Sequence, residues 1–177
     1  MQQINKGEKT VIKNNLLAVL THICIAFISF ILYFLFYRTD MYNENGAGKI
    51  VIYVILLLLV IFLYIFSVKL LKPMSSFIKN ILSVILPSII GVAVYLLNAL
   101  YFNEFLNNGL EYVVYKAYNM PFVPLQDVFY NLFVYKMYNY KIYHFFMIML
   151  SFLPTLLMFI GLQVQTVNMK SNKNSMM

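Results

Sequence analysis

Two titratable side chains, His22 and Cys24, lie within the first apolar stretch of the chain. A thiol and an imidazole can together form a Cys–His nucleophile. On a helix, however, neighbouring side chains are three or four residues apart, and residues two apart point to different faces. We therefore expect His22 to hydrogen-bond a neighbouring helix and Cys24 to pack as a small apolar residue. Asn98 is a second polar residue expected within an apolar stretch, where it can form an interhelical hydrogen bond.

The sequence carries no motif that predicts catalysis. GxSxG, HExxH, CxxC and glycine-rich phosphate loops are absent, and the six acidic residues occur singly. The long apolar stretches contain no Asp, Glu, Lys or Arg, although ion-coupled transporters and proton relays usually place such a group at depth. The sequence thus predicts a protein with no catalytic residues, no cofactor and no metal site.

The composition predicts an integral membrane protein whose first partner is the lipid bilayer. Of the 177 residues, 62% are hydrophobic and 11% are charged, and the mean hydropathy is +0.78. Soluble domains are about 45–50% apolar and about 25% charged. The basic residues are all lysine except Arg38 and lie at the ends of apolar stretches, which argues against nucleic acid as a partner. Abundant Ile, Lys, Asn, Tyr and Phe have A/T-rich codons, which favours a low-GC bacterium as the source.

Four stretches are long enough to cross a bilayer as helices, at 1.5 Å per residue and about 30 Å of hydrocarbon. They are residues 16–37, 50–68, 81–102 and 142–164. Helices satisfy their own backbone hydrogen bonds in lipid, so the predicted fold is all-α. We expect one transmembrane domain over residues 1–177, an integral membrane four-helix bundle.

The distribution of charge predicts the orientation of these helices. Residues 1–15, 69–80 and 165–177 together hold eight lysines and one acid, Glu8. The alternate segments, 38–49 and 103–141, hold five basic and five acidic residues. Because lysine and arginine concentrate in cytoplasmic segments, both termini of this multi-pass protein are expected on the cytoplasmic side of a cell membrane.

The external loop 103–141 is long enough to hold structure of its own. Residues 109–118 can form a short helix that Pro121 and Pro124 would end. Apolar residues then recur at helical spacing from Leu125 to Tyr140, which predicts an external helix lying on the outer leaflet. Its expected role is an anchor, a cap over a cavity or a docking face, and the candidate interaction surface consists of Asp127, Phe129, Tyr130, Phe133, Tyr135 and Tyr138. A fifth span here would place Asp127 and Lys136 in lipid, each at a cost of about 2.5–3.5 kcal/mol.

Proline and glycine recur in the third and fourth stretches. Pro87 and Gly91 lie in the third, and Pro154 and Gly161 lie in the fourth. We expect helix kinks at these sites, with a neighbouring Ser or Thr hydroxyl bonding the freed backbone group. Such kinks are common in membrane helices, but they can also frame a substrate site.

Two classes of function follow from the sequence. The first is a non-catalytic accessory, immunity-type or scaffold protein that binds another membrane protein, or a second copy of itself, through its Tyr-rich external loop. The alternative is a small oligomeric transport or pore-forming component, with a cavity near Pro87, Pro154 and Asn98.

Overall fold

The computed structural model describes residues 6–37, 47–101 and 110–174, and every regular element in those ranges is helical. The all-α fold class is therefore confirmed. Three helical stretches are long and apolar enough to cross a membrane, namely Gly7–Phe36, Gly48–Leu70 and Lys141–Met169.

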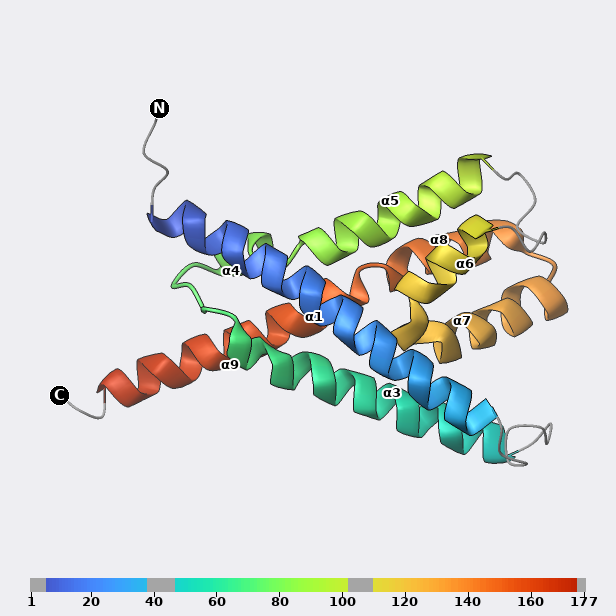
Figure 1. The fold of residues 1–177 in the computed structure, drawn as a ribbon, viewed down its shortest axis with the longest axis horizontal. Helices are drawn as coiled ribbons and strands as arrows, with labels where there is room; N and C mark the ends of the chain where they lie inside the picture. The colour runs from blue at the N-terminus through green and yellow to red at the C-terminus, as the bar shows by residue number, and fades with distance from the viewer. Residues whose placement is uncertain (1–5, 38–46, 102–109, 175–177) are drawn as a thin grey trace.

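The first two apolar stretches form long antiparallel helices. Helix α1 covers Lys6–Tyr37, and α3 covers Ala47–Ser67 and continues through the 3-10 turn η1, Val68–Leu70. Leu71 is extended and Pro73 follows, so the chain cannot continue as a helix. Figure 1 shows α1 and α3 close together where α1 ends and α3 begins and diverging toward the other end, where the first residues of α1 and the last residues of α9 both lie.

The third stretch is not one continuous helix, and this prediction must be corrected. Helix α4 covers Phe77–Leu82 and ends there, and α5 begins at Leu86 and runs to Tyr101. Pro87 is the second residue of α5, a position that proline tolerates because the first backbone N–H groups of a helix lack intrahelical acceptors. The proline thus begins a helix after a break and does not kink one.

The fourth stretch has a similar interruption. Helix α8 covers Tyr140–Leu150 and α9 covers Leu153–Asn174, with Ser151 and Phe152 between them. Pro154 is the second residue of α9, as Pro87 is of α5. The amide side chain of Asn139 begins α8 by accepting a hydrogen bond from the backbone N–H of Ile142, at 3.2 Å.

The segment between α5 and α8 forms a hairpin of short helices, residues 110–136. Helix α6 (Leu110–Tyr118) confirms the predicted short helix, and the 3-10 turn η2 (Met120–Phe122) forms the tip. Helix α7 (Val123–Phe129) and the π-helix η3 (Tyr130–Lys136) return from it. The two prolines allow this sharp reversal because neither can continue a helix begun before it.

The tip of the hairpin packs into the bundle, and the helix predicted at 125–140 follows it. The tip packs against α1 and α3, where the ring of Phe122 stacks on that of Tyr64 with centroids 5.9 Å apart. Phe122, Val123 and Gln126 are buried. The helix expected at 125–140 exists as α7 and η3. The buried side chain of its first turn is the polar Gln126, which donates to the carbonyl of Asn119 at 3.3 Å, whereas Val128 on the predicted apolar face is 50% exposed.

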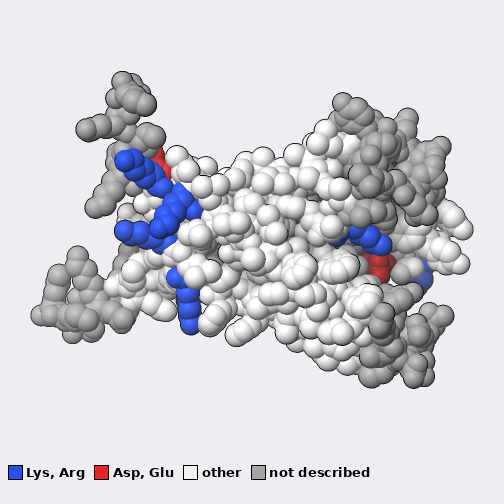
Figure 2. Space-filling model, in the orientation of Figure 1, with Lys and Arg blue, Asp and Glu red and all other residues white. Residues whose placement is uncertain are grey.

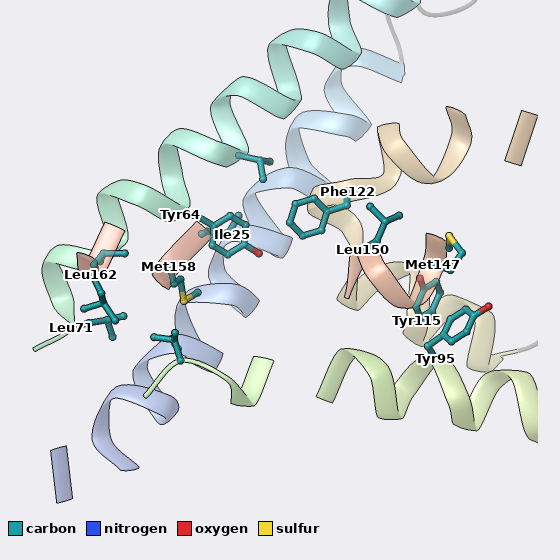
Figure 3. Close-up of a cluster of buried hydrophobic side chains, with 14 of the residues drawn as sticks. Ile25, Tyr64, Leu71, Tyr95, Tyr115, Phe122, Met147, Leu150, Met158 and Leu162 are labelled. Atoms are coloured by element: carbon teal, nitrogen blue, oxygen red, sulfur yellow. The ribbon is translucent and has the colours of Figure 1, made fainter. Parts of the chain in front are cut away.

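One hydrophobic core runs through the bundle. Figure 3 shows it extending from Leu71 and Leu162 at one end, through Tyr64 and Phe122, to Tyr95. The outer surface is different: on the face shown in Figure 2, the charged side chains of the described residues gather at the two ends and leave an uncharged band between them. A surface of this kind is expected where lipid surrounds the middle of a protein.

Candidate functional site

The breaks in the two interrupted helices meet inside the bundle. The hydroxyl of Thr155 on α9 donates to the carbonyl oxygen of Val84 at 2.7 Å, within the break between α4 and α5. The hydroxyl of Ser88 on α5 donates in turn to the Thr155 hydroxyl at 2.6 Å. Both side chains are buried. The sequence predicts that such hydroxyls bond a backbone group freed by a proline in their own helix. Thr155 instead bonds a carbonyl in the break of the other interrupted helix.

Asn15 of α1 bridges the first break from the other side. Its side-chain oxygen accepts from the backbone N–H of Leu86 at 3.0 Å, and its Nδ2 donates to the carbonyl of Leu82 at 2.6 Å. One amide therefore satisfies the last carbonyl of α4 and the first N–H of α5. Because a backbone N–H or carbonyl without a partner costs free energy when it is shielded from water, these bonds stabilise the break.

Gly91 makes room for the hairpin beside the break. A Cβ at this position would lie 3.2 Å from the ring of Tyr118 and 3.2 Å from the Cβ of Ser151. The Tyr118 hydroxyl reaches past the glycine and donates to the carbonyl of Pro87 at 2.6 Å. Gly91 thus acts through close packing between α5, α6 and the break before α9.

His22 lies at the centre of this region and is fully buried. Its Nδ1 is 2.5 Å from the hydroxyl of Tyr64 on α3, and its Nε2 is 3.0 Å from the carbonyl oxygen of Tyr118 at the end of α6. The ring also lies against the Tyr118 ring, with centroids 4.3 Å apart. The expectation that His22 hydrogen-bonds a neighbouring helix is confirmed.

The hydrogen bonds of His22 limit the chemistry that this central site can perform. Both nitrogens of His22 have protein partners, and the described residues include no cluster of three His, Cys, Asp or Glu side chains that could hold a metal ion. Cys24 is exposed on the outside of α1, whereas His22 is buried, as expected for residues two apart on a helix. The structure does not bring this pair together as a nucleophile and base.

The candidate interaction surface divides into a packed part and an exposed part. Phe129 and Phe133 pack on Phe146 of α8, with ring centroids 4.7 and 4.9 Å from it. In contrast, the side chains of Tyr135 and Tyr138 are 74% and 79% exposed. Tyr130 is 39% exposed, and its ring meets that of Tyr143 edge-on.

Asp127 anchors the hairpin to the two long helices. Its Oδ2 accepts from the hydroxyl of Tyr53 on α3 at 2.5 Å and from that of Tyr33 on α1 at 3.3 Å. The two tyrosine hydroxyls are themselves 3.1 Å apart. A carboxylate can be held in a partly buried position when it accepts several hydrogen bonds. The two tyrosine hydroxyls supply these bonds to Asp127.

The remaining predicted residues have simple positions. Gly161 lies where α9 crosses the end of α3, and a Cβ there would come 2.7 Å from Val68. Gly161 therefore allows α9 to pack closely on the end of α3, and it lies away from the break at Pro154. Asn98 is in α5, but its side chain lies outside the described residues. His144, beside Tyr95, has its Nδ1 2.5 Å from the Tyr95 hydroxyl.

Sequence reasoning missed the asparagines that hold the turns. Asn14 bonds both the N–H and the carbonyl of Lys72, at 3.1 and 2.8 Å, and Asn80 bonds those of Met74 at 2.8 and 3.1 Å. Both asparagines are buried. The signal available was the pair Asn14-Asn15 directly before an apolar stretch, but nothing in it specifies the backbone that each amide binds.

No protein-family model, curated protein sequence or solved structure matches this chain.

Proposed function

We propose that the chain is a multi-pass protein of the plasma membrane of a low-GC bacterium, with both termini in the cytoplasm. The three apolar helical stretches and the uncharged band support a membrane location. The lysine-rich segments 1–15, 69–80 and 165–177 support the orientation, because basic residues favour the cytoplasmic side. The α6–α7 hairpin is then a re-entrant element that enters from the outer side and returns to it.

Its proposed role is that of a non-catalytic accessory or immunity-type protein that binds another membrane protein through its outer end. The proposed binding surface at this end consists of Tyr135 and Tyr138. The observation that carries this proposal is the conformation of Tyr138, which has φ of 51° although it is neither glycine nor asparagine. A left-handed residue is usual at this place, because Tyr138 follows the end of η3 and the N–H of Asn139 donates back to the carbonyl of Phe133 at 2.7 Å. Glycine is the usual residue there, so a bulky tyrosine is kept at a cost in strain, which points to a function for its side chain. Burial does not explain the choice, since the side chain is 79% exposed.

Site-specific photocrosslinking in living cells tests this role. A photoreactive phenylalanine analogue placed at position 138 or 135 is expected to give a discrete adduct, identified by mass spectrometry. The same analogue at Phe27, which is 64% exposed on the middle of α1, serves as the control and should give none. The adduct partner should co-purify with the wild-type chain and be lost with Y135S/Y138S. Equal behaviour of positions 138 and 27 would contradict the proposal, and an adduct of two copies would make the partner a second copy of this chain.

A small transport component is the second candidate, and one observation favours it. Two interrupted helices meet near the tip of a hairpin at His22, an arrangement that transporters use to place a substrate site. Against it, Ser88 and Ser151 are buried and the space beside Gly91 is occupied by side chains.

Water access distinguishes the two candidates. In a C24S background, a cysteine placed at Ser88 should resist a small water-soluble thiol reagent from both sides if the bundle is filled. Rapid reaction from either side would instead support a transport path and count against the accessory role. A cysteine at Ser75, which is exposed in the turn before α4, is the positive control.

A further inference from the structure

An apolar groove lies on the outside of the bundle between α1 and α3. It has a volume of about 370 Å³, and its walls are formed by Leu20, Cys24 and Ile28 on α1 and by Leu63 and Phe66 on α3. Lys69 and Leu70 of η1 close the end that faces the lysine-rich side of the molecule. The lining therefore changes from apolar to basic along the groove.

The dimensions of the groove favour one hydrocarbon chain as its occupant. Its walls on α1 run from Leu17 to Ile28, which at 1.5 Å per residue is about 16 Å. That length is close to half of a hydrocarbon core of about 30 Å, or one leaflet. An acyl chain of one leaflet therefore matches the groove in length.

The basic end supplies the charge that selects a headgroup. The ammonium of Lys69 lies 4.3 Å from the ring centroid of Phe66, a groove residue, so it is held at the mouth. Lys13 lies one helical turn before Leu17, on the face that continues through Leu20 and Cys24. Both lysine side chains are exposed. A second groove, between α1 and α6, has about 400 Å³ but no charged lining residue, so it offers no such selection.

We propose that the α1–α3 groove is a binding site for one anionic phospholipid of the cytoplasmic leaflet. One acyl chain lies along Leu20, Cys24 and Ile28, and the phosphate and anionic headgroup lie between Lys13 and Lys69. This inference rests on the proposed membrane orientation, which places the lysine-rich end in the cytoplasm.

Native mass spectrometry of the full chain in a mild detergent tests the site. Phosphatidylglycerol and phosphatidylcholine with the same acyl chains are added separately, and the bound lipid is counted. Phosphatidylglycerol is expected to be retained more strongly, and K13Q and K69Q are each expected to weaken its retention about fivefold, since a lysine near an anionic surface contributes about 1 kcal/mol. K136Q, at the other end of the molecule, is the matched control and should change nothing. Equal retention of the two lipids, or an equal effect of K136Q, overturns the proposal.

Filling the groove provides an independent test. C24F places a ring in the middle of the groove and should reduce retention of both lipids, and I23F adds a ring elsewhere on α1 and should not. Cys24 and Ile23 are both exposed, so neither variant disturbs the core. Unchanged retention in C24F would show that lipid binds elsewhere. A wrong membrane orientation would be detected separately, because thiol labelling from outside the cell would then reach a cysteine at Ser75.

Discussion

His22 on α1 and Tyr64 on α3 share a hydrogen bond of 2.5 Å whose direction is set by a third residue. The other ring nitrogen, Nε2, contacts the carbonyl oxygen of Tyr118, which can only accept. Nε2 therefore donates, and in the neutral imidazole Nδ1 accepts from the Tyr64 hydroxyl. One side chain thus joins α1, α3 and the end of α6.

Replacing His22 is expected to loosen this junction. H22F leaves the Tyr64 hydroxyl and the Tyr118 carbonyl without these partners in a buried site, and we expect a loss of about 1–3 kcal/mol in the free energy of unfolding. Unfolding in mixed detergent micelles, followed by circular dichroism, measures the loss. C24A, two residues away and exposed, is the control and should stay within about 0.5 kcal/mol of wild type. An equally stable H22F would mean that the junction contributes little.

The contact between the two interrupted helices can be measured as a coupling energy. T155V keeps the shape of the side chain but removes the donor to the Val84 carbonyl and the acceptor for Ser88. T155V should destabilise the protein by about 1–2 kcal/mol, and T155S, which keeps the hydroxyl, should lose less. In a double-mutant cycle with S88A, the two substitutions should be less than additive because they remove the same bond. Strict additivity would show that the two hydroxyls act independently.

The close packing at Gly161 predicts that a destabilising substitution there is partly compensated by a second substitution at Val68. In G161A the new methyl group would lie 2.7 Å from Val68, which is fully buried, so α9 must move away from α3. We expect a loss of about 1–3 kcal/mol from overpacking, measured by the same unfolding assay. G161A/V68A should recover part of that loss because it removes the opposing methyl groups. G7A, where the nearest atom is the flexible end of Lys79 at 4.0 Å, is the matched control and should be tolerated.

A substitution of Tyr138 is expected to raise the stability of the chain and to remove binding of the partner. Glycine adopts φ of 51° without strain, so Y138G should stabilise the isolated chain by about 0.5–1 kcal/mol. The same variant should lose the partner that photocrosslinking identifies, since the exposed ring is gone. A Y138G chain that is less stable than wild type would show that the ring contributes to folding, which would remove the argument for a binding role.

The orientation proposal is tested by thiol labelling in a C24S background. A cysteine at Ser75 should react with a membrane-impermeant maleimide only after the cells are permeabilised. A cysteine at Tyr138 should react in intact cells, because it lies at the opposite end of the molecule and is exposed. Labelling of position 75 in intact cells would reverse the proposed topology.

The sequence by itself determined the helical class and the general location of the apolar elements. Long apolar stretches must satisfy their backbone bonds internally, which leaves helices as the solution in lipid. The lysines of residues 1–15 and 69–80 also indicated which segments lie at one end, and the bonds from Asn14 to Lys72 agree with that grouping. That His22 and Cys24 point to different faces of α1 followed from helical geometry alone.

Only the tertiary structure decided where the helices break and where the hairpin goes. The apolar sequence of residues 81–102 is compatible with a continuous helix, and the break before Leu86 is satisfied by Asn15 and Thr155, which lie 71 residues before Leu86 and 71 residues after Val84. Likewise, residues 110–136 have an apolar face that could lie on a membrane surface, but the bundle offers Tyr64 and His22 as partners for the tip. Local periodicity shows that a face must be covered, whereas the partner that covers it depends on segments distant in the sequence.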